Sequence, residues 1–549
     1  MTNTPHHVFN QSTPWTGSDL FEGHRALQDA LAYHCPTYDA PRLAALGQEA
    51  GSADMQLHAR LANLHRPTLH SHDRYGRRID QVEFHPSYHV LLGGAMRYGL
   101  HGTPWRLGPG GHVERAAAFM LFTELEPSVL CPVSMTYAVT PALRANAALH
   151  AAWGEGLAAT AYDPRVVPAS LKTALTMGMG MTEKQGGSDV RANTTCASFD
   201  GDDAWGRRYT LTGHKWFLSA PMCDAFLVLA QADSGLSCFF VPRWHHDGTV
   251  NPIRIQRLKD KLGNHANASG EVEFGGDTSA WLVGDEGRGV AQILAMGALT
   301  RLDCALGSAG LMRQSLTLAI HHTRERMAFG KYLAEQPLMK NVLADLALES
   351  EAATALALRL AHAIDASEHG RDEHEGVMRR VLTPIAKFWV CKRGAAFAQE
   401  AMECLGGNGY VEEGGQGVMA RIYREMPLNS IWEGAGNIMA LDLLRALRSA
   451  DVATALAEEL APALGEHAAF DRLANALPGR IDAAVDESQA RVLARDIALL
   501  VQAALLRRHS TEAVFAAFCA SRLAGAADVF GLLPAGTPFD ALLERALPQ

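Results

Sequence analysis

Met181-Thr-Glu-Lys-Gln-Gly-Gly-Ser-Asp189 is the most informative stretch of this 549-residue chain. Its two glycines let the backbone approach a planar ring closely, and the hydroxyls of Thr182 and Ser188 can donate hydrogen bonds. Taken alone, the same stretch is also typical of a solvated turn between a helix and a strand. The stretches that surround it in the sequence therefore decide what it means.

Composition and charge narrow the class of protein. The chain is 48% hydrophobic and 20% charged, which is ordinary for a globular protein. No apolar run reaches the roughly 18 residues that span a bilayer, and the N-terminus lacks the pattern of an export signal. Nine scattered cysteines without CxxC spacing predict reduced, buried thiols in a cytoplasmic protein. The formal net charge of −10 gives no overall reason to expect nucleic-acid binding.

Changes of residue pattern along the chain predict four segments, in keeping with a length that favours three or four domains. Short β-rich runs, such as 226–230 and 238–241, predict a small antiparallel sheet or barrel in the second segment. Helical spacing of apolar residues marks the other three. The predicted segments are an N-terminal helical domain at 1–174, a β domain at 175–285, a helical bundle at 286–445 and a further helical domain at 446–549.

Several local features refine this plan. The polar stretch 70–77 is expected to be a loop between helices, and Pro478-Gly479 is expected to break the last helical segment. Apolar residues at alternating spacings of three and four predict two helical faces that pack in a core. These faces are Phe388, Cys391, Ala395, Ala398, Met402 and Leu405, followed by Leu493, Ile497, Leu500 and Ala504.

Common nucleotide and metal motifs are missing from the sequence. None of the Gly-x-Gly pairs has the third glycine of a dinucleotide-binding fingerprint, and Gly330-Lys331 is followed by Tyr332 instead of Ser or Thr. The histidine pairs lack the i, i+4 spacing and matching carboxylates of a helical metal site, so no metal is expected. A bound dinucleotide must therefore be held by another kind of site.

Five motifs in order carry a resemblance to a known family. They are 181–189, 213–219, 326–330 with Gln336, 405–409 and 431–437. In this order and at these separations they resemble the acyl-CoA dehydrogenase flavoproteins. Longer strings at 7–11, 258–264 and 423–433 are similar to its AidB-type subfamily, which is associated with the bacterial response to alkylating agents. His265 is a departure, because the pattern usually has an arginine there.

The resemblance implies a fold and a cofactor. The fold is mainly α with a central β domain: an N-terminal helical domain, a small β-barrel or sheet domain, a C-terminal four-helix bundle and, here, an extra helical domain. The cofactor is FAD, held where the β domain meets the bundle. The residues assigned to it are Met181, Thr182, Gly187, Ser188, Trp216, Phe217, Ser219, Arg326, Phe329, Gln336, Glu403, Gly406, Gly407, Tyr423, Asn429, Trp432, Gly436 and Asn437.

Some of these assignments compete with simpler interpretations. Trp216 is implied to pack against the isoalloxazine, although a core tryptophan is the commoner case. Arg326 has the planar fork that suits pyrophosphate oxygens, yet an isolated helical arginine is usually a surface charge. By resemblance, Arg326, Phe329 and Gln336 contact the FAD of a neighbouring subunit, together with Glu403, Gly406 and Gly407. That arrangement implies a homotetramer.

Glu433 is the candidate catalytic base. It lies in Trp432-Glu-Gly-Ala-Gly-Asn437, which matches the motif that supplies the base in most of the family. A carboxylate beside the acyl α-carbon can take the α-proton as hydride leaves the β-carbon for flavin N5, and burial against an apolar substrate would raise its pKa towards neutrality. The alternative base position of the isovaleryl branch corresponds here to Thr300. A helix N-terminal acid favoured by the macrodipole is the other interpretation of Glu433.

The subfamily also suggests DNA binding through the last segment, which the charge there weakens. Residues 450–549 contain eight arginines, no lysine and thirteen acidic residues, a net charge of −5. Phosphate binding needs a cationic surface. The candidates for a local basic face are Arg491, Arg495 and Arg508.

Three functions follow as hypotheses. The first is an FAD-dependent acyl-CoA dehydrogenase with Glu433 as base and an unidentified electron-transfer partner. The second is a flavoprotein that binds or shields double-stranded DNA and has little dehydrogenase activity. The third is flavin-dependent oxidation of another small substrate, such as a nitroalkane.

Overall fold

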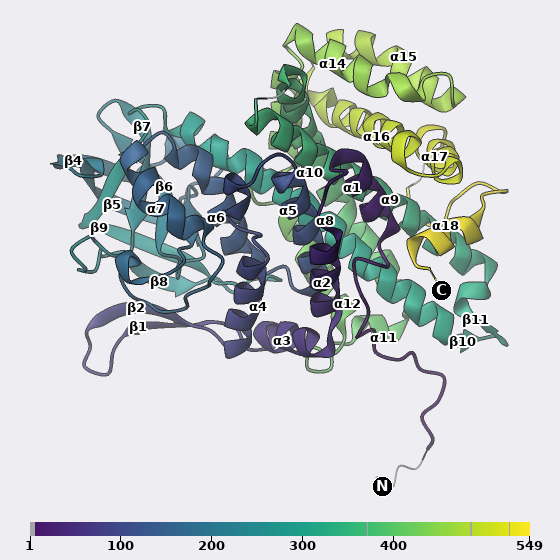
Figure 1. The fold of residues 1–549 in the computed structure, drawn as a ribbon, viewed down its shortest axis with the longest axis horizontal. Coiled ribbons are helices and arrows are strands. Elements are labelled where there is room, and N and C mark those ends of the chain that lie inside the picture. Colours follow the sequence, from purple (N-terminus) through teal and green to yellow (C-terminus); the bar gives the residue numbers. More distant parts are fainter. Residues whose placement is uncertain (1–5, 371, 484–485, 526–527, 549) are drawn as a thin grey trace. The chain divides into compact units, whose positions relative to one another are not determined.

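The computed structural model describes residues 6–370, 372–483, 486–525 and 528–548, and it divides into two compact units (Figure 1). Unit 1 comprises Met1–Gln56 and Cys304–Gln549, and unit 2 comprises Leu57–Asp303. The division into four segments that the sequence predicts stays a prediction.

Unit 2 combines helices with a β domain. Its helices before the β domain follow α3 (Ala53–Leu64), which begins in unit 1. They are α4 (Pro86–Arg97), α5 (Gly111–Leu125), α6 (Leu130–Leu143) and α7 (Ala147–Ala158). Short 3-10 turns lie at Thr103–Arg106 and Ala169–Leu171, and another lies within the β domain at Val190–Ala192. Nearly every residue of α5 and α6 is buried, as expected for helices that are apolar on all sides.

Seven strands of unit 2 form the central sheet. They are β3 (Met177–Gly180), β4 (Cys196–Asp203), β5 (Gly206–Ser219), β6 (Ala225–Ala232), β7 (Gly235–Pro242), β8 (Arg254–Leu258) and β9 (Ser269–Val283). Their order is β3-β6-β4-β5-β9-β7, β8 pairs with β9, and a further β6–β7 pairing closes the path into a small barrel. The predicted sheet or barrel is confirmed.

The longest pairing of the barrel joins β5 to β9. These strands run antiparallel, with Lys215 opposite Val272 and Ser219 opposite Ser269. The register shifts between Lys215 and Leu218, so this part of β5 departs from a regular ladder. β3 instead runs parallel to β6, with Gly180 opposite Val228. The loop that begins at Met181 therefore leaves the sheet at the end of β3.

A hairpin replaces the predicted loop at 70–77. Thr68–His72 (β1) and Arg78–Glu83 (β2) pair antiparallel, and their residues alternate between exposed and half-buried. The turn is stabilised by Asp73, whose carboxylate accepts hydrogen bonds from the backbone N–H groups of Tyr75 and Arg77. The prediction was wrong because the polar residues on both sides of the Asx turn form strands. In the sequence, these residues and the turn together look like one polar loop.

Unit 1 is helical. Its helices are α1 (Arg25–His34), α2 (Ala40–Gly51), α8 (Gly289–Glu325, which begins in unit 2), α9 (Pro337–Glu368), α10 (Glu373–Glu403), α11 (Gly407–Tyr410), α12 (Val418–Asn429), α13 (Gly436–Ala446), α14 (Ala450–Leu460), α15 (Ala468–Asp482), α16 (Ala490–His509), α17 (Glu512–Phe518) and α18 (Phe539–Ala546). Short helical turns lie at Leu333–Glu335, Ala461–Ala463, Glu487–Gln489 and Cys519–Leu523, and Met327–Ala328 (β10) pairs with Lys331–Tyr332 (β11).

The two predicted helical faces lie in α10 and α16. On α10, Phe388, Cys391, Ala398 and Met402 are buried and Ala395 is half-buried, whereas Leu405 is half-buried in the turn after the helix. All four residues of the second face are buried in α16. The prediction that Pro478 breaks the last helical segment was wrong, because Pro478 lies inside α15. Because Pro478 is exposed, water can reach the carbonyl that a proline leaves without its helical donor.

The cysteines and the most apolar helix are mostly buried. All nine cysteines are free, and eight of them are buried, as predicted. One helix, α8, is long and apolar enough by composition to cross a membrane. Buried residues make up 61% of its most apolar window, so α8 has the character of a core helix.

Candidate functional site

The loop Met181–Asp189 is fastened to the barrel at successive residues. Asn193 donates a side-chain hydrogen bond to the carbonyl of Met181 (2.9 Å), and the N–H of Trp216 donates to the carbonyl of Thr182 (2.8 Å). The N–H of Lys184 donates to the imidazole of His214 (3.0 Å). The loop therefore lies alongside β5, with Glu183 buried and with Lys184, Gln185, Ser188 and Asp189 exposed.

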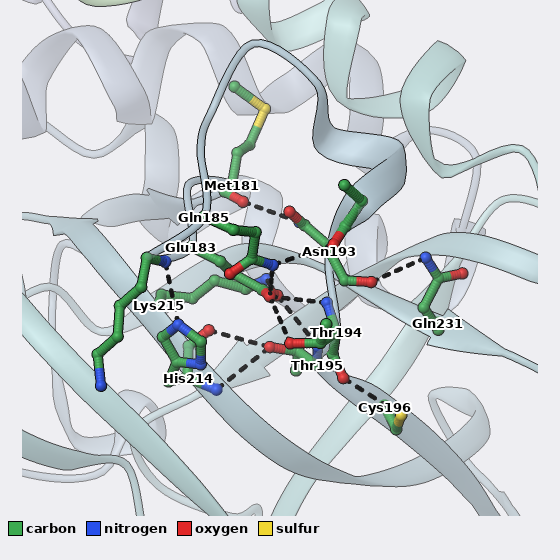
Figure 2. Close-up of polar contacts among 12 residues, drawn as sticks. Met181, Glu183, Gln185, Asn193, Thr194, Thr195, Cys196, His214, Lys215 and Gln231 are labelled. Carbon is green, nitrogen blue, oxygen red and sulfur yellow. Dashed lines mark hydrogen bonds and ion pairs between the residues drawn. The ribbon is translucent and has the colours of Figure 1, made fainter.

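Glu183 and Lys215 form a fully buried ion pair beneath this loop, shown in Figure 2. The Lys215 Nζ lies 2.6 Å from Glu183 Oε1, and neither side chain is exposed. Burial lowers the pKa of Lys215 to about 8, against the opposing effect of Glu183. Burial acts to raise the pKa of Glu183, but Lys215, Thr195 and Thr194 outweigh it and hold that pKa well below its usual range.

Trp216 is half-buried and surrounded by cations. The Lys259 Nζ lies 3.3 Å from the centroid of its indole ring, and Arg257 and Lys184 approach the same ring to 5.6 and 5.9 Å. Glu271 pairs with both Lys259 and Arg257. The neighbouring Phe217 ring is exposed. Trp216 is therefore not a core tryptophan, and its ring is polarised by nearby positive charge.

Three hydroxyls beside the loop are available to a ligand. Within residues 6–370 and the other described ranges, the side chains of Thr182, Ser188 and Ser219 have no hydrogen-bond partner. Gly187 explains how the Thr182 hydroxyl is presented, because a Cβ at Gly187 would lie 2.4 Å from Thr182 Oγ1. A larger residue at this position would force the Thr182 side chain to move. The β domain thus offers three hydroxyls without a partner among the described residues.

In unit 1, a tight hairpin holds Arg326, Phe329 and Gln336 together. Its two-residue turn is Phe329-Gly330, both with positive φ (53° and 79°). Gln336 donates from its amide to the carbonyl of Ala328 (3.2 Å). The Phe329 ring is 99% exposed, which is unusual for so large an apolar side chain.

The N-terminal segment contributes to this hairpin, which the sequence analysis missed. Arg326 donates to the carbonyl of Asn10, and the side-chain amide of Asn10 exchanges two hydrogen bonds with the backbone of Met327 (2.8 and 2.9 Å). Asn408 of α11 donates to the side chain of Gln11 (3.3 Å). The string at 7–11, used only to recognise the subfamily, was the available signal for this contact.

The other predicted cofactor residues of unit 1 lie at helix ends. Glu403 ends α10 and is exposed, Gly406 lies in the turn that follows, and Gly407 begins α11. A Cβ at either glycine would meet nothing within 4 Å among the described atoms, so the space above this turn is open. These residues can receive a ligand without rearrangement of their neighbours.

The stretch from Tyr423 to Asn437 joins α12 to α13. Trp432 donates from its indole N–H to Asn429 (3.1 Å), which in turn donates to Ser308 of α8 (3.2 Å). Tyr423 and Asn437 are exposed, and Gly436 is buried at the start of α13. A Cβ at Gly436 would lie 2.9 Å from Lys392 of α10, so the turn packs closely on that helix.

Glu433 occupies a left-handed backbone conformation in this turn, with φ at 59°. Such a conformation is strained for a glutamate and persists only where the surroundings impose it. The buried ammonium of Lys387 on α10 donates a hydrogen bond to the carbonyl of the next residue, Gly434. Because α13 begins only at Gly436, Glu433 lies before the helix and not inside its first turn.

The alternative base position is not an acid. Thr300 is buried and donates from its hydroxyl to the carbonyl of Gly297 (3.0 Å). His265, which stands where the family pattern usually has an arginine, lies 3.0 Å from a guanidinium nitrogen of Arg66. An arginine from another part of unit 2 therefore reaches that position.

The three arginines suggested for DNA contact their own chain. Arg508 donates to the carboxylate and carbonyl of the buried Glu459 (3.1 and 2.6 Å). Arg495 donates to Asp496 (2.7 Å), and the Arg491 guanidinium lies 5.5 Å from the Phe388 ring centroid. Arg508 is thus engaged within unit 1, whereas Arg491 and Arg495 are exposed.

A separate cavity of about 360 Å³ lies in unit 2 and includes none of the predicted site residues. Three arginines line it: Arg78, Arg243 and Arg254. Arg78 pairs with Asp80, and Arg254 pairs with Asp277. Arg243 donates to the carbonyls of Pro221 and Asp80 (2.6 and 3.0 Å). These contacts tie the β1–β2 hairpin to the barrel.

Comparison with known proteins accounts for almost the whole chain. The model of the adaptive response protein AidB N-terminal domain matches residues 10–164, and the acyl-CoA dehydrogenase middle and C-terminal domain models match 178–276 and 287–448. AidB of Escherichia coli (strain K12) is 45% identical over 94% of this chain and 94% of its own length. The chain belongs to the acyl-CoA dehydrogenase family.

Solved structures agree with the membership. The structure named Bd2924 apo-form is 32% identical, has a TM-score of 0.82 and covers 92% of this chain and 100% of its own. Caenorhabditis elegans ACDH-11 in complex with C11-CoA is 26% identical, has a TM-score of 0.83 and covers 100% of this chain and 94% of its own. The chain is an acyl-CoA dehydrogenase of the AidB type, and as such an FAD-dependent oxidoreductase.

The geometry fits the cofactor of this acyl-CoA dehydrogenase. Unit 2 offers free hydroxyls at Thr182, Ser188 and Ser219 and an uncovered ring at Phe217, and unit 1 offers open space above Gly406 and Gly407. Hydroxyl donors and open glycine backbone suit a flavin and its pyrophosphate. The donor set therefore matches FAD.

Proposed function

We propose that the protein oxidises a fatty acyl-CoA thioester to its α,β-unsaturated product, with Glu433 as the catalytic base. The observation that supports this most directly is the backbone of Glu433, which is held in a strained conformation by a buried cation on the adjoining helix. Strain of this kind concentrates at functional sites, where it fixes a reacting group in advance. A surface acid that merely favours a helix N-terminus needs no such support.

The reaction requires one proton and one hydride to leave the substrate. Glu433 takes the α-proton, and the electron pair of that C–H bond forms the new double bond as hydride departs from the β-carbon. FAD, when bound, supplies the acceptor for that hydride. The remaining residues act on binding and orientation, because the reacting carbon must lie within reach of the carboxylate.

Two groups of residues are proposed to hold the FAD. The first group comes from the β domain: Met181, Thr182, Gly187, Ser188, Trp216, Phe217 and Ser219. The second comes from the bundle: Arg326, Phe329, Gln336, Glu403, Gly406, Gly407, Tyr423, Asn429, Trp432, Gly436 and Asn437. Free hydroxyls in the first and open glycines in the second support the assignment.

The substrate class and the assembly are part of the same proposal. The C. elegans relative was solved with C11-CoA, which supports an acyl-CoA as the substrate here. An uncovered ring at Phe329, together with exposed Leu338 and Tyr410, supports a homotetramer in which these side chains are covered by another subunit. Nine free cysteines support a cytoplasmic location.

Glu433→Gln is the variant that tests the proposal. The purified variant should keep its FAD and its yellow colour, while bleaching of the flavin by acyl-CoA under anaerobic conditions is abolished. Glu413→Gln is the matched control, because Glu413 is also a glutamate in left-handed backbone (φ 42°) and is exposed. The control should bleach at the wild-type rate.

Two outcomes would contradict the proposal in different ways. Full activity of Glu433→Gln would show that another group takes the proton. A wild-type protein that contains FAD but is bleached by no acyl-CoA of any chain length would show that it is not a dehydrogenase of these substrates. Substrate-dependent oxygen consumption with a nitroalkane would then support the third hypothesis from the sequence.

A further inference from the structure

The carboxylate of Glu183 is the point where three parts of the β domain meet. Besides Lys215, it accepts hydrogen bonds from the N–H of Thr194 (2.7 Å), the hydroxyl of Thr194 (3.0 Å) and the N–H of Thr195 (3.1 Å). Gln185 donates to the same carboxylate from within the loop (2.8 Å). Figure 2 shows these donors converging on it. Both carboxylate oxygens are therefore fully used.

Lys215 has a more restricted set of contacts. Within the described residues its Nζ has one hydrogen-bond acceptor, Glu183. It precedes Trp216 in β5, and the N–H of Trp216 donates to Thr182, the residue before Glu183. Two successive residues of the loop are thus bonded to two successive residues of the strand, one pair through the backbone and the other through side chains.

Stability alone does not account for a buried ion pair. Removing two charges from water costs much of what their attraction returns, and well-packed apolar residues often stabilise a protein equally well. An ion pair differs from an apolar pair in its direction, because its hydrogen bonds form at one geometry only. What Glu183 and Lys215 provide is therefore a defined placement of the loop relative to β5.

That placement governs the groups that face away from the pair. Thr182 and Ser188 lie on either side of Glu183 in the loop, and their hydroxyls have no partner among the described residues. Trp216 lies next to Lys215. We infer that Glu183 and Lys215 are a positioning pair that holds the hydroxyls of the loop and the Trp216 ring in the arrangement that receives FAD.

This inference rests on the proposed cofactor role of the loop, and it concerns FAD affinity instead of catalysis. A loop already fixed before binding loses little conformational freedom when the ligand arrives, which raises affinity. Without the pair, the loop would have to be ordered by the ligand itself. The role can therefore be measured by FAD binding in the absence of any acyl-CoA.

The test is the double variant Glu183→Gln/Lys215→Met, which removes both charges while keeping both side-chain volumes. The matched control is Arg254→Met/Asp277→Asn, which removes an ion pair of similar geometry (2.7 and 2.5 Å) from the same sheet, but one that is partly exposed. For wild type and both variants, the apoprotein is titrated with FAD, and the visible absorption and circular dichroism of the bound flavin are recorded. Thermal unfolding of each apoprotein is measured in parallel.

The expected result separates placement from stability. The double variant should bind FAD about tenfold more weakly or worse, with altered flavin bands, while its apoprotein unfolds within a few degrees of wild type. The control variant should bind FAD as wild type does. The single variant Lys215→Arg, which keeps a cation beside Glu183, should lose less FAD affinity than the double variant.

Two results would overturn the inference. Unchanged FAD affinity and spectrum in the double variant would show that the pair has no positioning role. A large fall in apoprotein unfolding temperature that accounts for the lost affinity would show that the pair only holds the fold. Because these titrations contain no acyl-CoA, they give the same answer whether or not Glu433 is the catalytic base.

Discussion

One buried cation, Lys387, supports the turn that contains the proposed base, Glu433. The ammonium of Lys387 is almost fully buried and donates to the Gly434 carbonyl. A hydrogen bond between a charged group and a carbonyl is stronger than one between neutral groups, and in a buried place it is strengthened further. It can therefore offset a left-handed backbone at Glu433, which costs on the order of 1–3 kcal/mol.

Lys387→Met should lower turnover without loss of cofactor. The methionine keeps the buried volume but leaves the Gly434 carbonyl without its donor, so the turn can relax and displace the Glu433 carboxylate. A displacement of about 1 Å is enough to lower kcat roughly 100-fold, whereas KM for the acyl-CoA and the bound FAD should change little. Steady-state kinetics and the flavin absorbance per protein chain measure both.

Arg380→Met is the control for this variant, because Arg380 lies on the same helix and is exposed. It should leave kcat unchanged. A Lys387→Met protein with wild-type kcat would show that the turn holds its conformation without the ammonium.

Site residues differed in how far the sequence could predict them. Glu433 and the loop at 181–189 stand in short motifs, so their neighbours in the sequence identify them. Lys387 belongs to no such motif, and Asn10 lies in the string at 7–11, which indicates the subfamily but not the contact. Their partners lie 47 and 316 residues away in the chain. Nothing local marks a lysine on a helix, or an asparagine near the N-terminus, as the partner of a distant backbone group.

At the level of elements, burial decided which predictions succeeded. Strands β6 and β7 are almost wholly buried, so their continuous apolar runs are visible in the sequence. β1 and β2 are mostly polar and no residue in them is fully buried, so they lack the apolar run that marks β6 and β7 in the sequence. Pro478 likewise failed as a helix breaker because an exposed helix tolerates it.

Glu459 links three helices of unit 1, one of them through Arg508 of the last segment. It lies at the end of α14, is buried, and accepts hydrogen bonds from Arg359 of α9 (3.1 Å) and Arg508 of α16 (3.1 Å). Burial acts to raise the pKa of Glu459, but the two arginines outweigh it and lower that pKa below 4.5. Arg508 therefore serves the packing of these helices.

Glu459→Gln should destabilise the protein in a pH-dependent way. The pKa of Glu459 is lower in the folded protein than in the unfolded chain, so its stabilising contribution is present above about pH 4.5 and is lost as the pH falls through the lowered pKa. At pH 7 the variant should lose about 1–3 kcal/mol of unfolding free energy, because the buried Arg359 and the half-buried Arg508 lose a charged acceptor while Arg359 keeps Glu375. The difference from wild type should shrink as the pH falls below 4.5.

Urea unfolding at several pH values measures this difference. Glu458→Gln is the control, since the neighbouring Glu458 side chain is 63% exposed and pairs with His374. It should cost less than about 1 kcal/mol. A Glu459→Gln protein as stable as wild type at pH 7 would show that the network contributes nothing to the packing of α9, α14 and α16.

At the level of the whole molecule, the proposed cofactor residues come from both units, and Phe329 is the most exposed of their aromatic side chains. Phe329 stands at the tip of the β10–β11 hairpin with its ring 99% exposed. Its positive φ is also unfavourable for an aromatic residue. A chain that places a phenylalanine where both solvent and backbone disfavour it gains from the residue only if something else covers the ring.

Phe329→Asn isolates that gain. Asn-Gly is the preferred sequence for a two-residue turn with two positive φ angles, so the hairpin should be kept or strengthened while the ring is lost. If the ring packs against a neighbouring subunit, the variant should dissociate at concentrations where wild type is a tetramer, by a change of about 2 kcal/mol or more per contact. Its affinity for FAD should fall with the assembly. Light scattering gives the mass, and FAD titration gives the affinity.

Tyr75→Asn is the control, because Tyr75 is also an exposed aromatic residue in a hairpin turn, but of unit 2. A Phe329→Asn protein with wild-type mass and FAD affinity would show that the ring is not part of a subunit contact, and a monomeric wild type would exclude the tetramer itself.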